Sequence, residues 1–168
     1  MYRIRTVTTI GRFVMTFAAV VVVQGVLPHH FRVFSYFDLP LVLCVYYGFT
    51  LNRPGASILI GSALGLMQDS LSGAVMGTNG FSKTLIGFLA ASAGGKFNVD
   101  QPIARVLALF LFSLADGLVV SMLALVVGDA AGPAFDGAYG ARLLSAAFNT
   151  LLGLVMLGYH DRLSHATT

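Results

Sequence analysis

Six apolar runs account for most of the chain and constrain its fold more than any other feature. A helix needs about 20 mainly apolar residues to cross a bilayer. The runs cover residues 10–27, 33–51, 54–72, 81–95, 103–127 and 141–159. Only 10% of the 168 residues are charged, whereas about a quarter are charged in an ordinary soluble domain. The sequence therefore predicts an all-α integral membrane protein, in which residues 1–168 form a single polytopic transmembrane domain of six helices.

Prolines and charges refine these boundaries. Asp38 and Pro40 lie near the start of the second run, and proline is tolerated in a first helical turn, so the regular helix should begin at Pro40. Pro54 and Pro102 should begin the third and fifth helices in the same way. The first run follows basic residues but lacks a small-residue cleavage site, which predicts an uncleaved helix rather than a signal peptide.

The basic residues indicate the orientation, because six helices would place both termini on one side. Seven bases fall on that side: Arg3, Arg5, Arg12, Arg53, Lys96, Arg105 and Arg162. Three fall on the other: Arg32, Lys83 and Arg142. Because positive charge is enriched in cytoplasmic segments, both termini are expected in the cytoplasm. The bases are scattered singly, so the net charge of +3 does not indicate nucleic-acid binding.

The stretch from Gly65 to Gly87 is the most polar and glycine-rich interruption of the apolar pattern. Unsatisfied polar groups in hydrocarbon are costly, so such a segment needs a structural or functional reason. We expect a break between helices at residues 73–80. The candidate site residues here are Gln68, Asp69, Ser72, Gly73, Gly77, Asn79 and Lys83.

Small residues recur every four positions on both sides of this break. The third run carries Gly61, Gly65, Asp69 and Gly73, and the fourth carries Lys83, Gly87, Ala91 and Gly95. Residues four apart share a helical face, and small residues let helices approach closely in lipid. The pattern predicts a tight antiparallel helical hairpin with Gly61, Gly65 and Gly87 at its interface.

The estimated depths of Asp69 and Lys83 in the membrane are similar. With a rise of about 1.5 Å per residue, Asp69 lies about 24 Å from the level of Arg53, and Lys83 about 20 Å from that of Lys96. This predicts a contact between Asp69 and Lys83, since either charge alone would be expensive in lipid. The cluster either braces the broken helices or lines a cavity or docking surface open to the periplasmic side.

Asp116 is a second charged residue inside an apolar run. It lies eleven residues beyond Arg105 and hence about 16 Å deep, near the bilayer centre. Asn149 and Gln24 are its expected partners. Two interpretations stay open, a proton-coupled role and a hydrogen-bonded interior carboxyl.

No residue pattern indicates a catalytic, cofactor or metal site. The segment Gly77–Thr84 resembles a phosphate-binding loop, but Ser82 replaces its second glycine and no strand precedes it. His29 and His30 lack further ligands at suitable spacing. Cys44, the single cysteine, is expected to be a small buried hydrophobe.

Three motifs together resemble the rod shape-determining MreD family. They are Asp38 with Pro40, the Asn52-Arg53-Pro54 turn, and the pattern G-L-x-x-D-x-x-S-G-x-x-x-G-x-N from Gly65 to Asn79. Motifs cover residues 37–95, and length and hydropathy extend the resemblance to the whole chain. Phe37 departs from the family, which often has proline there, and Asp116 matches no family pattern.

The resemblance implies a non-enzymatic inner-membrane component of the bacterial elongation machinery. It implies about six helices in a fold similar to the substrate-binding subunits of energy-coupling-factor transporters. It also implies binding to MreC and, through MreC, links to MreB, RodA and the penicillin-binding transpeptidase that build lateral peptidoglycan. Asp69, Ser72, Gly73, Gly77 and Asn79 correspond to the family motif.

Two functions follow, and both are kept open here. The first is a membrane scaffold that binds MreC and so organises peptidoglycan synthesis and rod shape. The second is a small-molecule or lipid-binding transport subunit of the energy-coupling-factor type, with Asp69, Lys83 and Asn79 lining a pocket. Transport subunits of that type carry small residues four apart on the first helix, whereas this chain has only the adjacent Ala18 and Ala19 there. This difference favours the scaffold.

Overall fold

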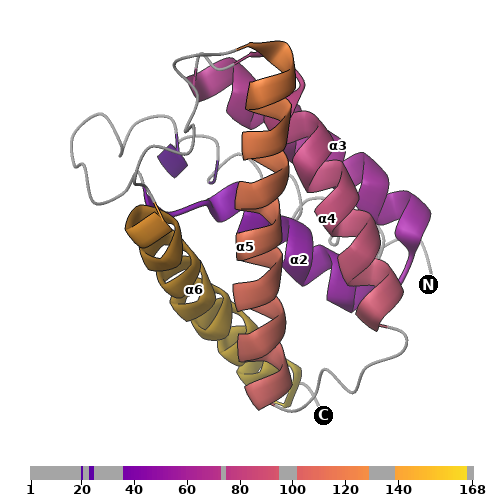
Figure 1. Ribbon diagram of the computed structural model, residues 1–168. Helices are drawn as coiled ribbons and strands as arrows, with labels where there is room; N and C mark the ends of the chain where they lie inside the picture. The colour runs from indigo at the N-terminus through magenta and orange to yellow at the C-terminus, as the bar shows by residue number, and fades with distance from the viewer. Residues whose placement is uncertain are drawn as a thin grey trace.

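The computed structural model describes Val20, Val23, Gln24 and residues 36–72, 75–94, 102–128 and 139–165; residues 102, 139, 141 and 156–165 are described by their backbone only. These residues form five helices and no strand. The helices are α2 (Leu39–Leu51), α3 (Pro54–Ser72), α4 (Thr78–Gly94), α5 (Pro102–Val127) and α6 (Tyr139–His165). Figure 1 shows them as one bundle in which α5 stands between α6 on one side and α2, α3 and α4 on the other. The expected first span, residues 10–27, lies almost entirely outside the described residues.

The helix starts that were predicted from prolines agree with the structure to within one residue, since α2 begins at Leu39 rather than at Pro40. Asp38 caps α2, because its Oδ1 accepts a hydrogen bond from the Leu41 amide at 2.9 Å. α3 has the predicted bounds, and α5 begins at Pro102. α4 begins at Thr78, three residues before the predicted start, so the break between α3 and α4 is shorter than expected. α6 starts two residues before and ends six residues after its predicted bounds.

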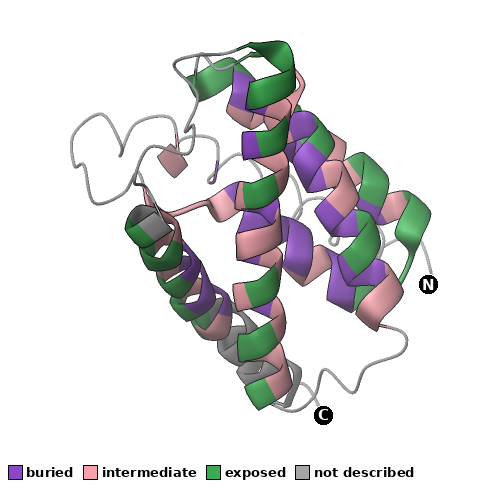
Figure 2. Cartoon of the chain, viewed as in Figure 1, coloured by how far each residue is buried: buried purple, intermediate pink, exposed green. Residues whose placement is uncertain are grey.

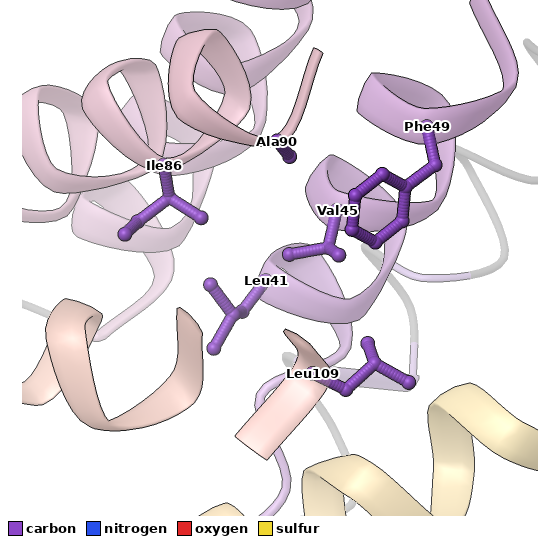
Figure 3. Packing of buried hydrophobic residues seen from close by; sticks show 6 residues of the cluster. All are labelled: Leu41, Val45, Phe49, Ile86, Ala90 and Leu109. Atoms are coloured by element: carbon purple, nitrogen blue, oxygen red, sulfur yellow. The ribbon is translucent and has the colours of Figure 1, made fainter. Parts of the chain in front are cut away.

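Helix α2 lies at the centre of the apolar core. Eight of its thirteen residues are buried. One face contributes Leu41, Val45 and Phe49 to a cluster with Ile86 and Ala90 of α4 and Leu109 of α5 (Figure 3). A second cluster contains Val20, Leu43, Cys44 and Leu64. The prediction that Cys44 is a small buried residue is therefore confirmed.

Helices α3 and α4 form the predicted tight hairpin. A Cβ atom added at Gly61 would collide with the backbone of Lys83, and one added at Gly65 with the backbone of Asn79. At Gly87 it would lie 2.7 Å from the Ser57 carbonyl oxygen. Only glycine allows the two backbones to approach this closely.

The outward faces of the bundle are apolar. On α5, Ile103 is 79% exposed and Val126 is 83% exposed, and further exposed leucines follow along its length. Figure 2 shows exposed residues along α3, α5 and α6. Among the described residues, one helix, residues 103–127, is long and apolar enough to cross a membrane, while residues 39–51 and 142–155 form shorter apolar helices.

Candidate functional site: a buried ionic cluster

Asp69 is buried, 1% exposed, and satisfies the first turn of α4. Its Oδ2 accepts hydrogen bonds from the amides of Gly77 at 2.8 Å and Gly80 at 3.1 Å. Its Oδ1 accepts from the amide and the side chain of Asn79, at 3.0 and 2.9 Å. The first amides of a helix have no partner within it and carry partial positive charge. One carboxylate therefore caps α4 from the preceding helix, which explains why α4 starts earlier than predicted.

Lys83 is fully buried on α4 and donates to three side chains. Its Nζ lies 2.8 Å from Asp38 Oδ2, 3.1 Å from Asp116 Oδ2 and 3.2 Å from Asn79 Oδ1. An ammonium group has three N–H donors, so these three partners match its capacity. Lys83 thus joins the start of α2 to the middle of α5.

The predicted contact between Asp69 and Lys83 is wrong. Asp69 is engaged by the start of α4, and Lys83 is engaged by Asp38 and Asp116. The Asn79 side chain connects the two groups, because its Nδ2 donates to Asp69 and its Oδ1 accepts from Lys83. Helices α3 and α4 pack together as predicted, but the Asp69 carboxylate is already occupied by the amides at the start of α4.

Asp116 is a hydrogen-bonded, paired interior carboxyl, 6% exposed. Its Oδ1 accepts from Ser82 Oγ at 2.6 Å, in addition to its contacts with Lys83. The expected partners, Asn149 and Gln24, are wrong. Asn149 bonds elsewhere, and Gln24 Nε2 donates to the Phe37 carbonyl oxygen at 3.0 Å.

Helix α6 reaches the same region through amide and hydroxyl groups. Asn149 Oδ1 accepts from the Asp38 amide at 2.8 Å, and its Nδ2 donates to Ser113 Oγ on α5 at 3.0 Å. Ser145 Oγ donates to the Tyr36 carbonyl oxygen at 2.7 Å. The segment before α2 is therefore held from α6 as well as from α4.

The remaining predicted site residues have varied positions. Gln68 Nε2 donates to Asp38 Oδ2 at 3.3 Å, while its Oε1 is buried without a partner. Ser72 is exposed and donates to the Asp69 carbonyl oxygen at 3.4 Å. Gly77 has a φ of +100° and presents its amide to Asp69. Gly73 lies outside the described residues.

Sequence reasoning missed Asp38 as a partner of the cluster, whereas Ser82 was expected among its polar residues. Asp38 was noted only as part of a motif at a helix start. A signal for the second acid was present, since the estimated depths of Asp116 and Lys83 differ by only about 4 Å.

The contacts of the cluster indicate cohesion rather than reaction chemistry. Three charged side chains and their hydrogen-bonding neighbours bring α2, α3, α4, α5 and α6 together at one level of the bundle. No group of three or more metal-ligating side chains occurs among residues 36–72, 75–94, 102–128 and 139–155. What the arrangement can do is fix the relative positions of helices in a medium that offers no water to charged groups.

A comparison with protein families decides the relationship. The model of the rod shape-determining protein MreD matches residues 7–162, nearly the whole chain. The chain belongs to the MreD family. This family is a membrane-protein family of shape-determining structural components, so the chain is a membrane protein with a role in rod shape. No curated protein and no solved structure matches it.

Membership in the MreD family places the ionic cluster within a membrane protein. The family match includes Asp38, Asp69, Lys83 and Asp116, so all four ionisable residues lie inside the membrane-protein region that the match covers. Charged residues inside such a region are costly unless they are paired. Here all four are paired or hydrogen bonded.

Proposed function

We propose that this chain is a non-enzymatic membrane scaffold of the cell-wall elongation machinery, which binds MreC and thereby helps to organise peptidoglycan synthesis. The observation that carries the proposal is the MreD family match over residues 7–162. Through MreC, the scaffold would be linked to MreB, RodA and a penicillin-binding transpeptidase. Its own contribution would be a rigid surface rather than a reaction.

The ionic cluster supports this role by bracing the helices that form such a surface. In lipid, the hydrophobic effect does not hold helices together, so packing and polar contacts must do so. Lys83 connects α2 with α5, and the glycines of α3 and α4 allow close packing of the hairpin. The apolar outer faces of α5 and α6 would then be available to lipid or to a partner helix.

The proposal includes six transmembrane helices in the bacterial inner membrane, with both termini in the cytoplasm. The seven-to-three distribution of basic residues supports this orientation. Labelling can test it, because Cys44, the only cysteine, is buried. A Thr168→Cys variant should react with a membrane-impermeant maleimide only after the cells are opened. Labelling in intact cells to the same extent would contradict the orientation.

Co-purification tests the partner. Tagged chain and MreC should be isolated together in mild detergent, and depletion of the chain should convert rod-shaped cells to spheres that the wild-type gene restores. A chain that supports rod shape but never co-purifies or crosslinks with MreC would contradict the proposed partner. Rod shape that persists after depletion would contradict the scaffold itself.

A further inference from the structure

A half-open apolar groove lies between α2, α4 and α5, at the end of the bundle away from the ionic cluster. Its volume is about 270 Å³, and almost no polar surface lines it. Three alanines, Ala93, Ala104 and Ala108, create the space because their side chains are only methyl groups. Phe49 and Phe112, whose ring centroids are 6.0 Å apart, also line it.

The lining excludes water as the occupant. A buried water needs two to four polar partners, and this groove offers essentially none. Protein interiors are otherwise close-packed, and empty apolar space is destabilising. The groove volume of about 270 Å³ far exceeds the space of a single water, so a short flexible hydrocarbon segment would fit.

The groove opens toward the lipid-facing side of α5. Leu107 and Leu111 line it and are 57% and 54% exposed. The neighbouring outward residues Ile103 and Val106 are also exposed. A molecule that enters the groove would therefore come from the bilayer, laterally, and would keep part of its length in lipid.

Positive charge lies at the same end of the bundle. The groove itself lies near helix ends: Phe49 precedes the end of α2 by two residues, Ala93 precedes the end of α4 by one, and Ala104 follows the start of α5 by two.

The turn after α2 contains the exposed Arg53, which makes no ion pair with the residues that the structure describes. Asn52 of that turn packs against Gly94, at the end of α4, so the turn stays close to the groove. Arg105 adjoins Ala104 on α5.

We propose that this groove binds one acyl chain of an anionic phospholipid whose phosphate lies at the level of Arg53. The apolar lining recognises the chain, and the exposed Arg53 at its end favours a negatively charged headgroup. This inference requires that the chain lies in a membrane, and it is independent of MreC binding. The other conceivable occupants, a partner helix or a second copy of the chain, become outcomes of the test.

The absence of tryptophan allows a direct experiment, since a single introduced tryptophan is the only one in the chain. Leu107→Trp reports on the rim of the groove. Leu59→Trp is the matched control, because both leucines are exposed and each lies five residues after the proline that begins its helix. Each variant is reconstituted into vesicles of equal phosphatidylglycerol and phosphatidylcholine, with brominated acyl chains on only one of the two lipids.

Bromine quenches tryptophan at contact, so the ratio of quenching by the two lipids measures selectivity. For Leu107→Trp we expect a preference for phosphatidylglycerol of about fivefold, the effect of one basic residue near an anionic lipid. For Leu59→Trp the ratio should be near one. Equal ratios for both reporters would overturn the proposal. Quenching of Leu107→Trp by neither lipid would also overturn it, because another protein segment would then cover the groove.

Two further variants distinguish the contribution of the groove to the lipid preference from that of the Arg53 charge. Ala108→Phe in the Leu107→Trp background should fill the groove and reduce the ratio to that of the control. If this variant does not fold, Ala93→Leu fills the same space from α4. Arg53→Gln should remove the preference while quenching by both lipids persists. A preference that survives both the filling and the Arg53→Gln change would show that the groove is not its origin.

Discussion

Asp69 and Asp116 are both buried aspartates inside the bundle, yet their partners differ in kind. Asp69 accepts hydrogen bonds from amides at the start of α4, and it forms no ion pair with the residues that the structure describes. Asp116 lies in the middle of α5, where the backbone amides are already bonded within the helix, and it contacts Lys83 and Ser82. A carboxylate at a helix start can thus be satisfied locally, whereas one within a helix needs a side chain from another helix.

This difference determines what happens when a partner is removed. Loss of Asp69 leaves neutral amides without acceptors, and these can be partly satisfied by rearrangement of the first turn. Loss of Lys83 leaves two carboxylates, Asp38 and Asp116, without their shared cation. Uncompensated buried charge is the more costly defect.

The largest effect is therefore expected from Lys83→Met. It should lower the free energy of unfolding by about 3–5 kcal/mol, the cost of breaking a buried ion pair from one side. Reversible unfolding in mixed micelles, followed by circular dichroism, measures it. Arg53→Met is the control, since Arg53 is exposed and should change stability by no more than about 0.5 kcal/mol. Equal losses for the two variants would mean that the buried contacts of Lys83 do not stabilise the bundle.

The next largest effect should come from a glycine substitution in the α3–α4 hairpin, which contains the groups that bind Asp69 and Asp116. Gly65→Ala places a methyl group against the backbone of Asn79 and Gly80, which cannot yield as a flexible side chain would. We expect a loss of about 2–3 kcal/mol, in the upper part of the range for overpacking. Gly55→Ala, on the same helix with no atom within 4 Å of the added Cβ, should be neutral or slightly stabilising. A similar loss for both glycines would contradict the close approach of α3 and α4.

Asp69→Asn should cost less than Lys83→Met. Asparagine keeps one acceptor but turns a donor toward amides that are themselves donors, so about 1–2 kcal/mol should be lost. Hydrogen exchange at the amides of Gly77 and Gly80 should accelerate, because these amides bond directly to Asp69. Ser70→Ala, next in sequence and exposed, provides the control for both measurements. Unchanged exchange at these two amides would show that Asp69 is not the cap.

Asp116→Asn should have the smallest effect, within about 1 kcal/mol, because it leaves one acid and one base, Asp38 and Lys83, in contact. Asp38→Ala should cost more, since alanine removes the cap of α2 as well as the contact with Lys83. Unfolding of both variants under the same conditions measures the difference. A larger loss for Asp116→Asn would reverse the assigned importance of the two carboxylates.

Much of the fold was accessible from the sequence because it depends on local rules. Prolines defined the starts of α3 and α5 and placed that of α2 within one residue, and the spacing of small residues defined the hairpin. The start of α4 was placed too late because its cap comes from Asp69, eleven residues before Gly80 on another helix. A cap supplied from outside the helix leaves no signature beside the helix start.

The partners in the candidate site could not be derived in the same way. Spacing gives the depth of Asp69, Lys83 and Asp116 but not the arrangement of helices around α2. Two acids, Asp69 and Asp116, were available to Lys83 at similar estimated depth, and the choice between them depends on which carboxylate is already occupied by backbone amides. The sequence favoured the acid nearest in the chain, whereas the bundle supplies acids from α2 and α5.

The central claim is that Lys83 stabilises the bundle by compensating Asp38 and Asp116, and a double-mutant cycle tests it most directly. Lys83→Met, Asp116→Asn and the double variant are unfolded under identical conditions. If the claim is right, the double variant is more stable than Lys83→Met alone, because one uncompensated carboxylate has been removed, and the coupling free energy exceeds about 1 kcal/mol. If the two losses simply add, the charges do not act on one another and the claim is contradicted.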